Sequence, residues 1–143
     1  MQIQPFKMED EPGVIALWQQ CDLMRPWNDP HKDIHRKLAL GREMFLIGSL
    51  DGQIIATLMA GYEGHRGWLN YLAVAPAYRR RGFARRIVAV AETLLRDAGC
   101  PKINLQVRTS NQEVIAFYRR IGYSVDDVVS MGKRLEFDDR AGS

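Results

Sequence analysis

The chain is poor in cysteine and has no long apolar run. Its 143 residues include two cysteines, Cys21 and Cys100, whose spacing suits neither a zinc cluster nor a disulfide framework. No segment approaches the roughly 20 consecutive apolar residues that cross a membrane. The N-terminus also lacks the basic start and apolar core of a signal peptide. We therefore expect a cytoplasmic protein with reduced thiols and no membrane partner.

A large excess of one charge is also lacking. Charged residues make up 26% of the chain, and the net charge is only +3. Much of that excess lies in one arginine cluster, whereas a nucleic-acid-binding protein spreads basic residues over a whole face. We therefore expect a local anion site and no nucleic-acid partner. A length of 143 residues with 46% apolar content predicts a single domain spanning residues 1–143.

The cluster places five arginines within eight residues, from Arg79 to Arg86. It follows an apolar run at 68–74 and opens a helical pattern that continues to residue 98. Unpaired N–H groups and the helix dipole make a helix N-terminus a phosphate site. Gly82 has no Cβ to block close approach, and Ala84 is nearly as small. The pattern predicts a pyrophosphate cradle; the alternative is a solvated basic helix start, with or without nucleic-acid contact.

Hydrophobic periodicity predicts the order β-α-α-β-β-β-α-β-α-β-β. Asp51-Gly52 predicts a two-residue hairpin turn. Asn28 or Asp29 is expected to cap the second helix, and Ser110 or Asn111 the last. Mixed strands with helices on both faces indicate an α/β or α+β sandwich. The expected strands are 3–6, 44–50, 53–62, 68–74, 103–107, 123–125 and 128–135, and the expected helices are 8–21, 30–40, 81–98 and 111–122.

Three stretches resemble the GNAT N-acetyltransferases. Residues 72–84, Leu-Ala-Val-Ala-Pro-Ala-Tyr-Arg-Arg-Arg-Gly-Phe-Ala, resemble the family's acetyl-CoA loop, Gln/Arg-x-x-Gly-x-Gly/Ala after a strand. Residues 111–123 resemble its pattern Asn-x(6)-Tyr-x(3)-Gly-Phe/Tyr, which puts Asn111 and Tyr118 on one helix face. Residues 21–30, Cys-Asp-Leu-Met-Arg-Pro-Trp-Asn-Asp-Pro, are similar to the YpeA-type bacterial acetyltransferases.

The resemblance covers most of the chain and implies a fold and an activity. The fold is the GNAT acyl-CoA N-acyltransferase fold, with a mixed, mostly antiparallel sheet of about seven strands. The activity is direct transfer of an acetyl group from acetyl-CoA to a primary amine of a small molecule or a protein, without a metal. The alternative is a CoA-binding sensor or interaction module on the same fold without turnover. A homodimer through C-terminal edge strands is left open.

The resemblance also implies roles for individual residues. The backbone at Leu72, Ala73 and Val74 would bind the pantetheine arm and supply the oxyanion donor. Asn111 would bond the same arm, and Tyr118 would act as general acid toward the sulfur. The alternative for this pair is a helix cap and a half-buried aromatic. The pyrophosphate would lie against Arg79, Arg80, Arg81, Gly82, Phe83 and Ala84.

A general base is harder to identify from the sequence. Where family members that acetylate protein N-termini carry a glutamate, this chain has Gln106, which cannot accept a proton. Glu63 is the next candidate, acting through a water, and its alternative is a solvated turn residue. His31 and His35 lie one helical turn apart, but no third metal ligand is apparent.

The acceptor is expected to bind at the irregular segment between the first two helices. There Arg25 would clamp a carboxylate, Trp27 would form a wall of the pocket, and Asp22 or Asp29 would hold an ammonium group. The alternative is a structured connection, with Trp27 in the core and Asp29 as a helix cap.

Overall fold

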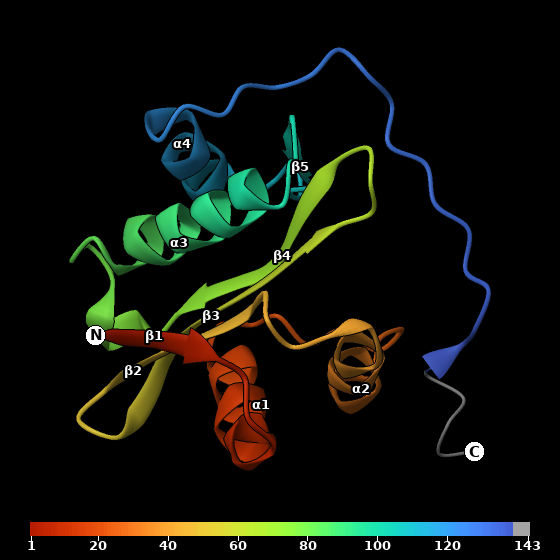
Figure 1. Cartoon of the computed structure of the whole chain (residues 1–143). Coiled ribbons are helices and arrows are strands. Elements are labelled where there is room, and N and C mark those ends of the chain that lie inside the picture. Colours follow the sequence, from red (N-terminus) through yellow and green to blue (C-terminus); the bar gives the residue numbers. More distant parts are fainter. Residues whose placement is uncertain (139–143) are drawn as a thin grey trace.

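The centre of the molecule is a five-stranded sheet in the order β1-β2-β3-β4-β5. The computed structural model describes residues 1–138. Two helices, α1 and α2, cover one face of the sheet, and α3 and α4 cover the other (Figure 1). The strands are β1 (Gln2–Pro5), β2 (Phe45–Leu50), β3 (Gln53–Tyr62), β4 (Gly67–Val74) and β5 (Ile103–Leu105). The helices are α1 (Glu11–Gln20), α2 (Pro30–Leu40), α3 (Phe83–Asp97) and α4 (Gln112–Arg120), with short 3-10 turns η1 (Met8–Asp10) and η2 (Pro76–Tyr78).

Local sequence signals explain where these elements begin and end. Asp51 and Gly52 have φ values of 52° and 77°, as a two-residue hairpin turn between β2 and β3 requires. Asp29 caps α2 by accepting from the N–H groups of His31 and Lys32, at 2.9 and 3.4 Å. Gly99 follows α3 with φ 90°, which favours glycine. The hairpin and the Asp29 cap are confirmed.

Strand β4 joins the two halves of the sheet and then loses one of its neighbours. It pairs with β3 antiparallel along most of its length. Its parallel pairing with β5 covers only Gly67–Leu69 against Ile103–Leu105. The rest of β4, up to Val74, therefore has an open edge on the β5 side within the described residues. Such an edge offers unpaired backbone groups to an extended ligand.

The expectation of about seven strands is wrong for residues 1–138, which hold five. Residues 123–125 and 128–135 have the β-branched content of strands, but they form no ladder with β5. Their contacts on this side are made by side chains of the residues that flank β5, between Gln106 and Ser130 and between Lys102 and Asp126. Their apolar side chains also stay in solvent, with Met131 and Leu135 about nine-tenths exposed at 89% and 90%. Residues with strand propensity form a strand only where their side chains are buried and their backbone pairs with a neighbouring strand.

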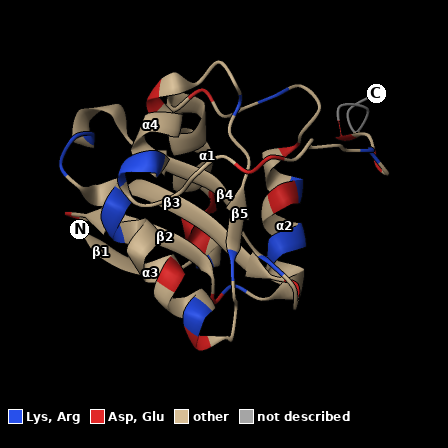
Figure 2. Cartoon of the chain, turned by 90° about the horizontal axis from the view of Figure 1, so that it is seen from above, with Lys and Arg blue, Asp and Glu red and all other residues tan. Residues whose placement is uncertain are grey.

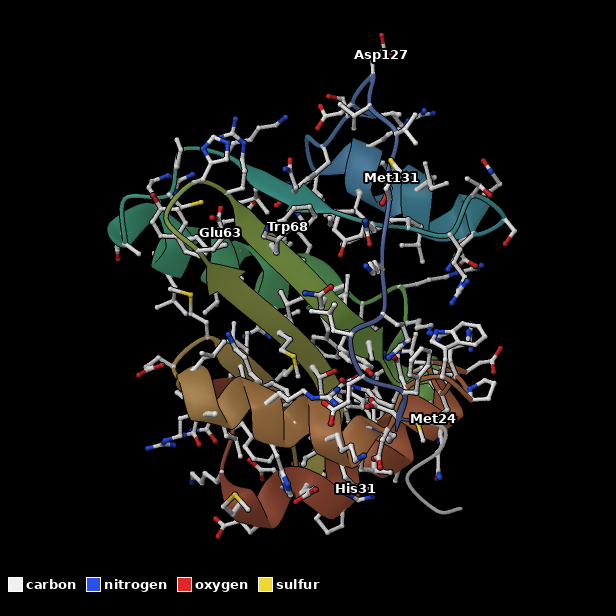
Figure 3. All side chains as sticks on the ribbon, turned by 90° about the vertical axis from the view of Figure 1, so that its right-hand side faces the viewer. Met24, His31, Glu63, Trp68, Asp127 and Met131 are labelled. Atoms are coloured by element: carbon white, nitrogen blue, oxygen red, sulfur yellow. The ribbon has the colours of Figure 1, made fainter. Side chains whose placement is uncertain are left out.

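Residues 124–138 instead form an extended segment, which we call the C-terminal strap. It runs from α4, past Asp127 and Met131, to α2 on the opposite face of the sheet (Figures 1 and 3). Its far end is fixed by Arg36 of α2, whose guanidinium donates to both oxygens of Asp138 at 2.7 and 3.0 Å. The Asp138 side chain is fully buried, and the Arg36 guanidinium holds its pKa well below the ordinary range. A charge-assisted, two-pronged contact of this kind is strong and directional.

We predict that Asp138→Asn releases the strap while leaving the core intact. The asparagine keeps the shape but loses the charge that pairs with Arg36. The heteronuclear ¹⁵N NOE of the amides in residues 124–138 should fall, because the segment moves more freely, and that of β2 and β3 should stay unchanged. Because pairing lowers the pKa of Asp138, the wild-type strap should also loosen as the pH falls below the ordinary carboxyl value near 4.

The matched control is Asp126→Asn. Asp126 pairs with Lys102 at 2.9 Å, but both side chains are nearly half exposed, and exposed pairs contribute little. An equal ¹⁵N NOE of the strap amides in both variants and the wild type would contradict a fixing role for Asp138.

Candidate active site

The loop between η2 and α3 presents a row of unpaired backbone donors. Arg80 has φ 64° and Gly82 has φ 80°, so two left-handed residues alternate with their neighbours. Backbone of this kind turns successive N–H groups toward one concave side. No hydrogen bond within residues 1–138 uses the N–H groups from residue 80 to residue 84, and Gly82 caps α3 without a side-chain bond. The loop is therefore a ready anion site at a helix N-terminus.

The arginine side chains of this loop are partly committed to the protein. Arg79 folds back, and its Nε donates to the carbonyl oxygen of Val74 at 3.0 Å. The guanidinium carbon of Arg81 lies 5.3 Å from the ring centroid of Tyr78. Figure 2 shows basic residues gathered at this loop and along the start of α3. The side chains thus supply a positive field, while the backbone N–H groups remain available for contact.

The end of β4 turns its backbone toward the open edge. The N–H of Ala75 bonds to the carbonyl of Ile55 in β3, at 2.8 Å. Because antiparallel residues alternate, both backbone groups of the preceding Val74 point away from β3. The Val74 carbonyl confirms this direction, since it accepts from Arg79 and, at 3.4 Å, from the thiol of Cys21. The N–H of Val74 therefore faces the open edge, close in the chain to the loop between η2 and α3.

Tyr118 lies on α4 with its hydroxyl uncommitted. The residue is only 6% exposed, and its ring contacts Phe117 and Tyr123 edge to face, with centroids 5.1 and 5.3 Å away. Burial raises its pKa above the ordinary tyrosine value, so the hydroxyl stays protonated. No bond within residues 1–138 uses this hydroxyl, and none of their fully buried side-chain polar atoms lacks a partner. The hydroxyl oxygen is therefore reachable from outside.

Asn111 caps α4, as its sequence context predicts. Its Oδ1 accepts from the N–H of Val114 at 3.3 Å. The cap leaves the amide nitrogen of Asn111 for another partner. Both readings of this residue, as a cap and as a ligand contact, are compatible with that geometry.

A hollow of about 1250 Å³ lies between β5, α4 and the strap. Trp68, Gln106 and Tyr118 line it. The carboxylates that line it are Glu92 and Asp126. Glu92 accepts from the hydroxyl of Tyr123 at 2.8 Å, and Asp126 is paired with Lys102. The hollow thus brings Tyr118 and Gln106 together beside carboxylates that already have partners.

Comparison with known proteins agrees with this geometry. The model of the acetyltransferase (GNAT) family matches residues 14–123. The chain belongs to the GNAT acetyltransferase family. A relative named acetyltransferase, from Yersinia pestis (strain Pestoides F), is 46% identical over 138 residues, covering 96% of this chain and 98% of the relative.

Solved structures support the GNAT fold. Ard1 from Thermoplasma volcanium has a TM-score of 0.76 at 23% identity, over 87% of this chain and 83% of Ard1. The PaiA N-acetyltransferase from Thermoplasma acidophilum, solved in complex with coenzyme A, has a TM-score of 0.76 at 16% identity. That match covers 90% of this chain and 92% of PaiA. No helix within residues 1–138 is long and apolar enough to span a membrane.

The structure gives Glu63 a place in the β3–β4 turn. Its Oε1 accepts from the N–H groups of His65, at 3.0 Å, and Arg66. Glu63 precedes β4, whereas the loop between η2 and α3 follows it, and eight strand residues span about 25 Å. Glu63 also does not line the hollow that contains Tyr118. Figure 3 shows it in the turn that leads into β4. The geometry therefore supports the alternative reading, a turn residue.

The loop between α1 and α2 is a structured connection. Arg25 donates to the carbonyl oxygens of Asp22 and Met24, both at 2.8 Å, and Asp29 is the cap of α2. Trp27, unlike Arg25 and Asp29, has no hydrogen bond within residues 1–138 that holds its side chain. The residue is 42% exposed, and the guanidinium carbon of Arg108 lies 5.6 Å from the centroid of its ring. Of these three predicted acceptor-site residues, Trp27 is thus the one whose side chain remains available as a wall.

The structure adds contacts that the sequence did not indicate. Arg108 reaches Trp27 across 81 positions of the chain, and no local pattern marks such a pair. His31 and His35 both contact Glu11 of α1, at 2.7 and 3.4 Å, and hydrogen bonding to His31 lowers the pKa of this carboxyl. No group of three residues within 1–138 is arranged to hold a metal ion.

We predict that Glu63→Gln changes the rate of acetyl transfer by less than about twofold. Glutamine keeps the oxygen that accepts from His65 and Arg66, so the turn survives, but it cannot take a proton. The measurement is kcat/KM with an active amine between pH 6 and 9. A tenfold loss in a folded Glu63→Gln protein would restore Glu63 as the general base.

Proposed function

We propose that this protein transfers the acetyl group of acetyl-CoA to a primary amine. The observation that carries the proposal is the row of five unpaired N–H groups at the start of α3. A pyrophosphate offers several oxygens to such a row, and the arginines around it favour an anion. The coenzyme A bound by the related PaiA structure is the fitting ligand class. The residues we assign to the pyrophosphate are those of the predicted loop, Arg79, Arg80, Arg81, Gly82, Phe83 and Ala84.

The open edge of β4 is proposed to bind the part of acetyl-CoA that follows the pyrophosphate. Leu72, Ala73 and Val74 would pair with the pantetheine arm as an added strand does. Asn111 would bond the same arm through its free amide nitrogen. The N–H groups that face the open edge then donate to the thioester carbonyl, whose oxygen becomes negative as the amine attacks.

The transfer has a simple balance of bonds and protons. The amine nitrogen forms a bond to the carbonyl carbon, and the carbon–sulfur bond of the thioester breaks. The sulfur leaves as a thiolate and takes the proton of the Tyr118 hydroxyl. The nitrogen releases one proton to water. Tyr118 is reprotonated from solvent, so the products are an amide and CoA.

Two properties of Tyr118 support its role as the acid. Burial keeps the hydroxyl protonated, and the hydroxyl has no partner within residues 1–138 to compete with a ligand. An ordinary thiol has a pKa about 1.5 below that of an unperturbed tyrosine, and burial raises the pKa of Tyr118 further, so proton transfer to a free thiolate is uphill. The Tyr118 hydroxyl therefore first donates a hydrogen bond to the sulfur, and its proton is transferred only as the carbon–sulfur bond breaks.

The acceptor is proposed to approach from the side of Trp27 and the hollow. Trp27 would wall this approach, together with the guanidinium of Arg108 on its ring. The carboxylates of the hollow are already paired, so no side chain there is placed to remove the proton of the amine. Water serves that purpose for an amine that arrives uncharged. The sensor alternative requires no group at the sulfur, and the free Tyr118 hydroxyl favours turnover.

Calorimetric titration tests the cradle. We expect micromolar binding of acetyl-CoA and none of NAD. Gly82→Ala should weaken acetyl-CoA binding at least tenfold, because the added methyl group would occupy open space at the loop and strain its left-handed backbone. Gly99→Ala is the matched control, since Gly99 also has positive φ and open surroundings but lies at the other end of α3. Equal binding by both variants would contradict the cradle.

Substitution of Tyr118 tests the acid. We expect Tyr118→Phe to lower kcat at least tenfold and to leave the dissociation constant of acetyl-CoA within about twofold, because only the hydroxyl is removed. Thiol release from acetyl-CoA with a panel of small amines and peptides measures the rate. Tyr123→Phe, on the same aromatic cluster, is the control. An unchanged kcat in Tyr118→Phe would show that the acid is elsewhere.

A further inference from the structure

The open edge of β4 begins at a bulge that centres on Tyr71. On β3, Thr57 and Met59 are two positions apart, but their partners on β4, Ala73 and Asn70, are three apart. The extra residue is accompanied by φ 54° at Tyr71, a left-handed conformation that a bulky residue rarely adopts. Such a conformation persists only where the surroundings impose it.

Three elements hold Tyr71 in this conformation. From β3, the Thr57 hydroxyl donates to the Tyr71 carbonyl at 2.9 Å. From α1, the Trp18 ring stacks on the Tyr71 ring, with centroids 3.8 Å apart and planes within 13°. From α2, Asp33 accepts from the Tyr71 hydroxyl at 2.6 Å. The backbone, the ring and the hydroxyl of one residue are thus fixed independently.

Thr57 is the buried centre of this arrangement. It is fully buried, and its Oγ1 also accepts from the indole N–H of Trp18 at 2.9 Å. A hydroxyl has one proton to donate. Because the indole occupies the acceptor side of Oγ1, that proton is directed at the Tyr71 carbonyl. The chain Trp18–Thr57–Tyr71 therefore fixes a backbone carbonyl through a side-chain hydroxyl.

The bulge decides which backbone groups face the open edge. Side chains and backbone groups alternate along a strand, so one extra residue reverses the alternation for everything that follows. Without the extra residue at Tyr71, the N–H of Val74 would turn toward β3. The donors assigned above to the thioester carbonyl therefore depend on the bulge.

We infer that Thr57 is a positioning residue for acetyl transfer. Its hydroxyl, directed by Trp18, holds the Tyr71 bulge and thereby aims the N–H groups of the open edge at the thioester carbonyl. The inference rests on the proposed function, because it concerns how the same site orients its oxyanion donors. Thr57 touches no ligand itself; it acts through Tyr71.

The test reads the thioester carbonyl directly. Isotope-edited infrared spectra of acetyl-CoA labelled with ¹³C at the carbonyl are recorded free and bound. Bound to the wild type, the carbonyl band should move to lower frequency, because hydrogen bonds weaken the C=O bond. Thr57→Val should lose most of that shift and at least tenfold in kcat. Thr57→Ser keeps the hydroxyl and should restore both.

The dissociation constant of acetyl-CoA and a control variant distinguish a positioning role of Thr57 from a general loss of structure. The dissociation constant of acetyl-CoA should rise by less than kcat falls in Thr57→Val, because the pyrophosphate donors at residues 80–84 lie outside the bulge, although the pantetheine contacts at residues 72–74 follow it. Thr93→Val makes the same chemical change on α3, where the hydroxyl bonds to Ala89, and should leave the band and kcat unchanged. The double variant Trp18→Phe/Thr57→Val removes the indole N–H that Thr57→Val would leave unpaired, and should show the same loss.

Two results would overturn the inference in different ways. If folded Thr57→Val keeps the full carbonyl shift and kcat within twofold, Thr57 does not position the donors, and the proposed function stands. If the wild type binds no acetyl-CoA, the proposed function fails, and the inference fails with it.

Discussion

The proposed cofactor site depends on the backbone conformation of the loop at the start of α3. Left-handed residues at Arg80 and Gly82 turn five successive N–H groups to one side, and none of these groups has an acceptor among residues 1–138. A helix of fifteen residues stands behind them, so its dipole adds to their positive field. Arg79 connects this loop to β4, because its side chain bonds to the Val74 carbonyl. The anion site and the open strand edge are therefore parts of one rigid surface.

The second half of the site is formed by elements that are distant in sequence. α4 brings Tyr118 to the hollow, the segment after β5 brings Gln106, and the strap lines one side. The strap is held at its far end by Arg36, on the helix that also carries Asp33 and its bond to Tyr71. One helix, α2, thus contacts both the strap and the β4 bulge.

Much of the fold and the cofactor half of the site could be predicted from sequence, because their signals are local. Glycine at position 82, the Asp51-Gly52 turn and the Asp29 cap each act within a few residues, and each lies where it was expected. Residues 128–135 show the limit of this reasoning. Their strand propensity is evident, but a strand also needs an edge to pair with, and that depends on tertiary structure.

The acceptor half could not be predicted, because its contacts join remote positions. Nothing in the sequence pairs Arg108 with Trp27, or Thr57 with the Tyr71 carbonyl. For Glu63 the sequence suggested more than the geometry supports. Its residue type suits a general base, but its carboxylate accepts hydrogen bonds within the β3–β4 turn. The bulge at Tyr71 was also invisible, because a bulky residue gives no local sign of positive φ.

The most direct test of the central claim is the amide spectrum of the cradle. In ¹⁵N-labelled protein, addition of acetyl-CoA should shift the amide protons from residue 80 to residue 84 strongly downfield, because each would gain a phosphate oxygen as acceptor. Free pantetheine, which has no pyrophosphate, should leave these five resonances in place. If acetyl-CoA binds and the five amides do not move, the backbone at the start of α3 does not hold the pyrophosphate, and the account is wrong.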